Sequence, residues 1–135
     1  MKEFKLIASI ENLEQVINFI NKELDSNACP AKIKTQIDVV IDELFANIAN
    51  YAYKEKDGEV IIKIDFEENP KCVEITFMDR GIPFNPLDRE DPDITLSINE
   101  RQIGGLGIFM VKKIMDEVTY DFKEGYNILK IKKNI

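Results

Sequence analysis

Residues 33–53, IKTQIDVVIDELFANIANYAY, have the pattern of the longest helix in this chain. Apolar side chains recur every three or four residues, which is the period of one helix face. Pro30, just before the stretch, suits the start of a helix. The pattern therefore predicts a long amphipathic helix that packs on a core. Its apolar positions are Ile33, Ile37, Val40, Ile41, Leu44 and Ile48.

Strand and helix patterns extend outward from this helix in both directions. Apolar and polar residues alternate in the strand patterns, and Asn12 is a candidate N-cap for an earlier helix. In chain order we expect a strand at 2–10, a helix at 13–24, the long helix, a hairpin of strands at 60–66 and 72–78, a helix from 108, and a second hairpin at 118–122 and 128–132.

This order of elements predicts the fold class. Helices are segregated from mostly antiparallel strands, which is typical of a two-layer α+β sandwich. A chain of 135 residues has the usual size of one domain, so we expect a single domain over residues 1–135. Residues 80–103 contain prolines and alternating acids without helix or strand periodicity. A segment of that kind is often a lid or a binding loop.

Composition excludes several classes of function. The net charge of −7 argues against nucleic acid as a partner, because phosphate backbones attract basic surfaces. The chain has no histidine, so Ser-His and Cys-His nucleophile pairs cannot form on it. No apolar stretch approaches the roughly 20 residues of a membrane span, and no signal peptide is apparent, so we expect a cytoplasmic protein. Cys29 and Cys72 suit reduced packing residues rather than a disulfide or zinc site.

Glu43 and Asn47 form the first candidate site. They are four residues apart and therefore share one face of the long helix, with Asn50 a further three residues along. Asparagine is a poor helix former, so its repetition here favours a functional role. One interpretation is an amide that coordinates Mg²⁺ beside a carboxylate general base. The other is a solvated helix face next to the core.

The tripeptide Asp79-Arg80-Gly81 is the second candidate, because it directly follows a strongly apolar strand. A carboxylate at that position can be shielded from water and accept a hydrogen bond from an exocyclic amine. Gly81 would allow a flat ring to approach closely. The same sequence is also common in simple turns.

Residues 104–107, Gly-Gly-Leu-Gly, form the third candidate. They precede an apolar helix, so their backbone N–H groups would lie at the positive end of a helix dipole, where phosphate binds favourably. No Gly-Lys-Ser/Thr sequence follows, so this is not a Walker motif. A flexible loop end is the alternative.

Taken together and in this order, the three motifs resemble the N box and the two glycine boxes of the GHKL superfamily of ATPases. The resemblance covers nearly the whole chain and implies a Bergerat-type ATP-binding fold, in which helices cover one face of a mostly antiparallel sheet. It implies ATP and Mg²⁺ as cofactors. Glu43 would be the catalytic base, Asn47 would bind Mg²⁺ and phosphate, and Asp79 would accept the adenine amino group. The other implied nucleotide-binding residues are Gly81, Gly104, Gly105, Leu106 and Gly107.

Within this superfamily the chain is most similar to the anti-sigma factor and serine-kinase branch. The pattern Asp-x-Gly-x-Pro-Phe-x-Pro, at residues 79–86, carries that resemblance. It implies a protein-serine kinase that phosphorylates a small antagonist protein of the anti-anti-sigma, STAS type. It also implies a sigma factor as a second partner and a homodimer as the oligomeric state. Arg101 cannot be aligned securely with the arginine of the kinase members, and residues 125–127, Gly-Tyr-Asn, replace the Gly-Thr of many relatives.

Two alternatives follow from these departures. The chain could be a nucleotide-dependent protein-binding module without kinase activity. It could also be a detached histidine-kinase-like ATPase domain, whose phosphoacceptor would lie on another chain because this one has no histidine.

Overall fold

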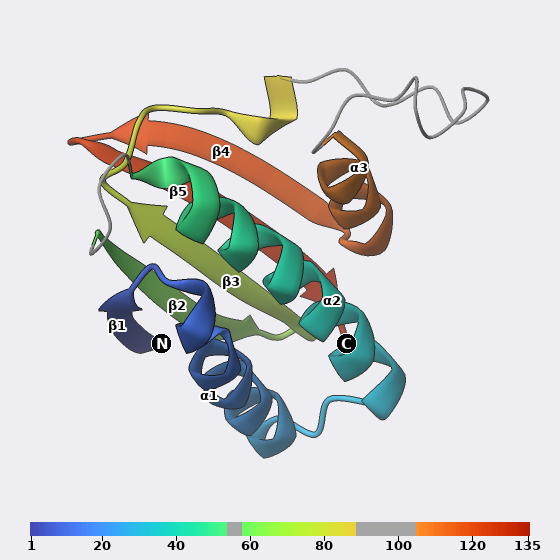
Figure 1. Ribbon diagram of the computed structural model, residues 1–135. Helices are drawn as coiled ribbons and strands as arrows, with labels where there is room; N and C mark the ends of the chain where they lie inside the picture. Colours follow the sequence, from blue (N-terminus) through green and yellow to red (C-terminus); the bar gives the residue numbers. More distant parts are fainter. Residues whose placement is uncertain (54–57, 89–104) are drawn as a thin grey trace.

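The computed structural model describes residues 1–53, 58–88 and 105–135, without the side chains of residues 105 and 106. Three α-helices and five strands make up the regular structure (Figure 1). One π-helical turn, Ile48–Ala52, extends α2. The elements are β1 Lys2–Ile7, α1 Leu13–Ser26, α2 Ala31–Asn47, β2 Glu59–Glu67, β3 Cys72–Asp79, α3 Gly105–Ile114, β4 Glu117–Lys123 and β5 Tyr126–Asn134.

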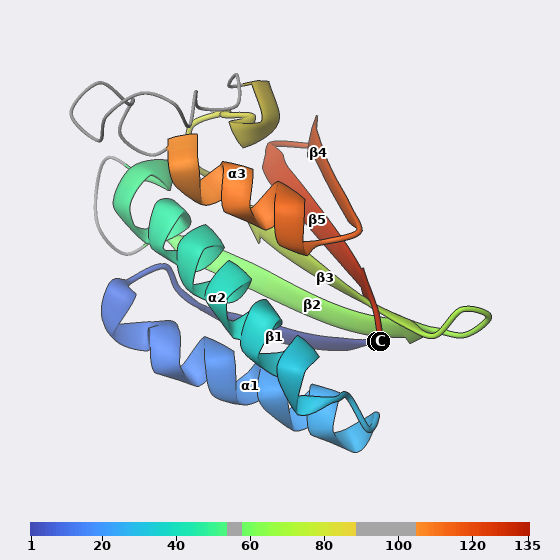
Figure 2. The same cartoon turned by 90° about the vertical axis from the view of Figure 1, so that its right-hand side faces the viewer.

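The strands form one antiparallel sheet in the order β1-β2-β3-β5-β4. The last strand of the chain, β5, therefore lies between β3 and β4. Figure 2 shows the helices on one side of the sheet. This two-layer arrangement confirms the predicted α+β sandwich and both predicted hairpins.

The core lies between the sheet and the helices. On α1 the fully buried residues Val16, Ile20 and Leu24 recur every four residues, which is why this segment folds as a helix with one apolar face. On α2 the stripe predicted from the sequence is buried at Ile37, Val40, Ile41 and Leu44. Alternate side chains of β2 and β3 pack against these helices from the sheet. They include Ile62, Ile64, Ile75 and Phe77.

The first predicted strand and the predicted cap of the following helix differ from the structure. The first strand ends at Ile7 rather than at residue 10, because a 3₁₀ turn, Ile10–Asn12, leads into α1. Asn12 does precede α1, but its side chain makes no capping bond and instead donates from Nδ2 to the Ile7 carbonyl at 2.9 Å. Tertiary contact with the strand thus replaces the local cap.

Both cysteines are buried and free, as their spacing predicted. No helix in the described part of the chain is long and apolar enough to cross a membrane.

Candidate functional site

Asp79, the last residue of β3, is the most buried acidic side chain in the described structure, with 5% of its surface exposed. Its Oδ1 accepts two hydrogen bonds of 2.9 Å, from the Gly81 N–H and from Asn127 Nδ2. Burial raises the pKa of this carboxyl above its ordinary value, and the two hydrogen bonds oppose that shift. Within the described residues Oδ2 accepts no hydrogen bond. It is the oxygen left for a group in the adjoining cavity, which Asp79 lines.

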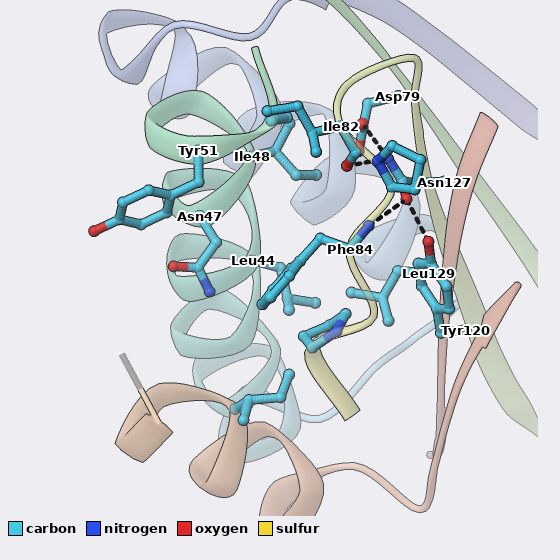
Figure 3. A pocket seen from close by; sticks show the side chains of 14 residues that line it. Leu44, Asn47, Ile48, Tyr51, Asp79, Ile82, Phe84, Tyr120, Asn127 and Leu129 are labelled. Carbon is cyan, nitrogen blue, oxygen red and sulfur yellow. Dashed lines mark hydrogen bonds between the residues drawn. The ribbon is translucent and has the colours of Figure 1, made fainter. Parts of the chain in front are cut away.

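Asn127 on β5 holds Asp79 in this position. The two residues are register partners across the β3–β5 ladder, and Asn127 is 6% exposed. Its Nδ2 also approaches the carbonyl oxygens of Gly81 and Ile82, at 3.3 and 3.1 Å. Its Oδ1 accepts from the Phe84 N–H at 3.2 Å and from the Tyr120 hydroxyl (Figure 3). One side chain therefore fixes the segment that follows β3.

Gly81 joins this segment to the end of α2. The Ile82 N–H donates to the Ala52 carbonyl at 2.8 Å, and a Cβ placed on Gly81 would overlap that same carbonyl oxygen. The π-helical turn that ends at Ala52 brings this carbonyl to the loop. Such turns are frequent at functional sites. Only glycine allows the two backbones to lie this close.

A cavity of about 440 Å³ lies between α2, α3, the end of β3 and strands β4 and β5. This volume falls within the usual range of small-molecule sites, and its walls are mostly apolar, as they are in such sites. Figure 3 shows Asn47 and Tyr51 on the helix side, and Asp79, Asn127 and Tyr120 on the strand side. The lining residues are Leu44, Asn47, Ile48, Tyr51, Ala52, Asp79, Ile82, Pro83, Phe84, Pro86, Ile108, Tyr120, Asn127 and Leu129.

Exposed apolar side chains gather around this cavity. Tyr51, Ile82 and Phe84 are 68%, 48% and 52% exposed, although all three line it. Clusters of large apolar side chains that remain exposed often mark binding surfaces. A flat, mostly apolar ligand with one donor for Asp79 would fit these walls.

Asn47 lies on the helix side of the cavity, across from Asp79, and Glu43 is one helical turn before it on α2 (Figure 3). Asn47 lines the cavity, and Asn47 Nδ2 donates to Glu43 Oε1 at 3.4 Å. Glu43 is half-buried beside the cavity without lining it. The backbone of Gly107 passes so close that a Cβ there would overlap the Glu43 carboxylate. The structure thus brings the first and third sequence motifs together.

The glycine motif itself differs from the predicted loop. Helix α3 begins at Gly105, so Gly105, Leu106 and Gly107 form its first turn, and Gly104 lies outside the described residues. The N–H groups of a first turn still lack intrahelical partners, so they can bind an anion. Arg101 and most of the predicted 80–103 loop, residues 89–103, also lie outside the described residues.

The donor set suits a hydrated metal rather than a protein cage. Among the described residues, no three acidic, histidine or cysteine side chains are grouped so that they could hold a metal ion. Mg²⁺ commonly keeps several waters and binds through one or two protein oxygens plus substrate phosphates. Asn47 lines the cavity and carries a carboxamide oxygen, the kind of ligand that could serve there.

Sequence reasoning missed Tyr120 and Asn127 as members of the site. Asn127 had been noted only as a departure from Gly-Thr, and Tyr120 only as a strand residue. Asn127 contacts residues 43 to 48 positions away, such as Phe84 and Asp79, and Tyr120 joins the site through Asn127. The one available signal was a polar residue, Asn127, directly before the predicted strand at 128–132.

The matches to known proteins cover the part of the chain that contains this site. Residues 6–133, which include every residue that lines the cavity, match the model of the histidine kinase-like ATPase domain. The serine-protein kinase RsbW of Staphylococcus aureus is 31% identical over 99 residues, which cover 67% of this chain and 59% of that protein. RsbW of Bacillus cereus is 33% identical over 98 residues, covering 70% of this chain and 60% of that protein. The match therefore spans about three fifths of the length of these relatives.

Proposed function

Since the chain belongs to the histidine kinase-like ATPase family, we propose that it binds ATP with Mg²⁺ in the cavity described above and acts as an anti-sigma factor-like protein-serine kinase. The observation that carries the nucleotide assignment is Asp79, a buried carboxylate with one oxygen left for the cavity. That oxygen would accept from the adenine amino group, while Ile48, Ile82 and Leu129 would pack against the ring.

The phosphates would lie at the other end, near α3. The N–H groups in the first turn of α3, at Gly105, Leu106 and Gly107, would bind the phosphate oxygens, and the preceding Gly104 would let the chain bend around them. Asn47 would hold Mg²⁺ through its side-chain oxygen. The bound ion would neutralise charge on the phosphates during transfer.

Glu43 would act as the general base. It would accept the proton of a serine hydroxyl as the serine oxygen forms its bond to the γ-phosphorus, and the bond from that phosphorus to the β,γ-bridging oxygen breaks, which releases ADP. The contact with Asn47 supports this role, because it keeps the carboxylate next to the metal-binding end. The RsbW relatives, named as serine-protein kinases, support a serine as the acceptor. We propose a small STAS-type antagonist as the protein substrate and a sigma factor as the regulated partner.

Calorimetric titration with Mg-ATP tests the nucleotide assignment. Wild type should bind, and Asp79→Asn should weaken binding about 10- to 100-fold, the worth of a hydrogen bond to a charged group. Asp42→Asn removes an exposed carboxylate from α2 and should leave binding unchanged. Equal affinity in Asp79→Asn and wild type, with both folded, would overturn the assignment.

Labelled ATP tests the kinase assignment. Purified candidate STAS-type antagonists should take up the γ-phosphoryl group with wild type and not with Glu43→Gln, which still binds ATP. An antagonist that binds wild type in the presence of Mg-ATP yet takes up no label would refute phosphoryl transfer.

A second function is favoured by one observation: Glu43 does not line the cavity. In that case the chain would be a nucleotide-dependent protein-binding module, in which ATP occupancy selects the surface offered to a regulatory protein. Capture of the partner would then depend on ATP and remain the same in Glu43→Gln.

A further inference from the structure

The orientation of the Asn127 side chain is fixed by its surroundings. The backbone N–H of Phe84 can only donate, and it lies 3.2 Å from Oδ1. The carbonyl oxygens of Gly81 and Ile82 can only accept, and they lie 3.3 and 3.1 Å from Nδ2. A rotated amide would place its NH₂ group against a donor and its oxygen against acceptors. The Tyr120 hydroxyl can donate or accept, so it does not select this orientation, but it donates to Oδ1 in it and helps to hold the amide in place.

This fixed orientation determines what Asp79 can offer to a ligand. Asn127 Nδ2 can only donate, so Asp79 Oδ1 is held as an acceptor by Asn127 and by the Gly81 N–H, both at 2.9 Å. Oδ2 then remains as an acceptor towards the cavity. When it is ionised, a carboxyl held in this way accepts from an amino group and has no proton to donate to a carbonyl oxygen.

We propose that Tyr120 and Asn127 are positioning residues that set the base preference of the cavity. They act through Asp79: the hydroxyl of Tyr120 holds Asn127 in place, and Asn127 holds the ionised Asp79 carboxylate where Oδ2 can accept from a 6-amino purine, a bond that a 6-oxo group cannot make. This inference rests on the proposed nucleotide-binding function. It assigns the discrimination between the two bases to two side chains that do not themselves contact the 6-amino or the 6-oxo group.

Inosine triphosphate is the matching probe, because it carries a 6-carbonyl oxygen and an N1–H where ATP has the 6-amino group and an unprotonated N1. A site built to pair a polar group strongly rejects the analogue that leaves that group unpaired. We therefore expect wild type to prefer ATP by at least about tenfold, the equivalent of one modest hydrogen bond.

Asn127→Thr and Asn127→Val form a matched pair of similar volume that differ in a hydroxyl. The threonine hydroxyl can donate to Asp79 and also accept from a neighbouring donor, whereas valine can do neither. We expect threonine to keep most of the preference for ATP and valine to lower the ratio of the two affinities by about tenfold.

Tyr120→Phe is the second test, because it removes one hydroxyl and keeps the ring. It should lower the ratio about two- to tenfold, the range for one neutral hydrogen bond. Tyr126→Phe is its control: this neighbouring phenol lies outside the cavity, with the Arg80 guanidinium 4.5 Å from its ring centroid. The control should leave the ratio unchanged.

Calorimetric titration of each folded variant with Mg-ATP and with Mg-inosine triphosphate gives the result. A loss of affinity that is equal for both nucleotides in Asn127→Val and Tyr120→Phe would show a merely structural role and overturn the inference while leaving ATP binding intact. Should Asn127→Val fail to fold, Tyr120→Phe decides alone. Binding of neither nucleotide to folded wild type would overturn the proposed function together with this inference.

Discussion

Gly107 and Glu43 are in contact across the boundary between α3 and α2, and a Cβ on residue 107 would overlap Glu43 Oε1. This contact makes the glycine a requirement of the proposed general base. Residue 107 lies in the first turn of α3, where alanine would otherwise be the better helix former.

We expect Gly107→Ala to displace the Glu43 carboxylate and to lower phosphoryl transfer at least about tenfold. The double variant Glu43→Ala with Gly107→Ala separates this effect from helix propensity. In the Glu43→Ala background the alanine should stabilise the fold by up to about 1 kcal/mol, whereas in wild type it should not. Urea unfolding of the four proteins measures this coupling. Identical effects of Gly107→Ala in both backgrounds would contradict it.

Asn47 should determine how strongly Mg²⁺ improves ATP binding. Removing its amide oxygen takes away the proposed side-chain ligand, so Asn47→Ala should reduce the ratio of ATP affinities with and without Mg²⁺ by about tenfold. Titrations with excess chelator and with excess Mg²⁺ give the two affinities. Asn50→Ala, three residues along in the π-helical turn and exposed, is the control and should retain the wild-type ratio. The same ratio in Asn47→Ala would exclude this residue as a ligand.

Asp79→Asn should separate stability from binding. Burial raises the pKa of Asp79 above 3.8, so the folded state takes up a proton that the unfolded state does not. The stability of wild type therefore rises, relative to the variant, as the pH falls through the raised pKa towards 3.8. The neighbouring titratable groups, Tyr53 and Tyr120, have raised pKa values and remain neutral in this range.

At neutral pH the asparagine variant should consequently be at least as stable as wild type, because Oδ1 of asparagine can accept both existing hydrogen bonds. The advantage of the variant should shrink as the pH is lowered towards about 4. Urea unfolding across this range measures the difference. A variant that is less stable than wild type at neutral pH, or whose advantage grows in acid, would contradict the assignment of a buried, ionised carboxylate.

Gly81→Ala should damage both the fold and the cavity. The added methyl group overlaps the Ala52 carbonyl, so the hydrogen bond from the Ile82 N–H must lengthen or break. We expect the free energy of unfolding to fall by about 1–3 kcal/mol and ATP affinity to fall with it. Arg80→Ala removes an exposed side chain one residue earlier and should cost well under half of that. Equal effects of the two substitutions would show that the close approach at Gly81 is relaxed in solution.

The helices and hairpins could be predicted because their signals are local. The stripe through Ile37, Ile41 and Leu44 has a helical period, and the alternation through Ile62 and Ile64 has the period of a strand. Strand order carries no such signal. Nothing in the periodicity indicates that β5 lies between β3 and β4, since that order follows from long-range pairing.

In the candidate site, too, the contacts set by local spacing were predictable and those set by long-range strand pairing were not. Glu43 and Asn47 are neighbours because of helical spacing alone, and the contact between them was predictable. The position of Asp79 at the end of a buried strand was also predictable. Its partner Asn127, 48 residues away, was not, because register across two strands decides which residue faces the carboxylate. The roles of Glu43, Asn47 and Asp79 remain predictions.

The place of β5 in the sheet also affects how the protein is made. Asp79 is synthesised well before Asn127. Until β5 has paired with β3, Asp79 Oδ1 lacks the hydrogen bond from Asn127, and the cavity lacks the wall that β5 forms. Under the proposed function, a growing polypeptide on the ribosome would therefore not retain nucleotide through Asp79 before β5 has emerged. Any partner that recognises only the nucleotide-bound form would ignore unfinished chains.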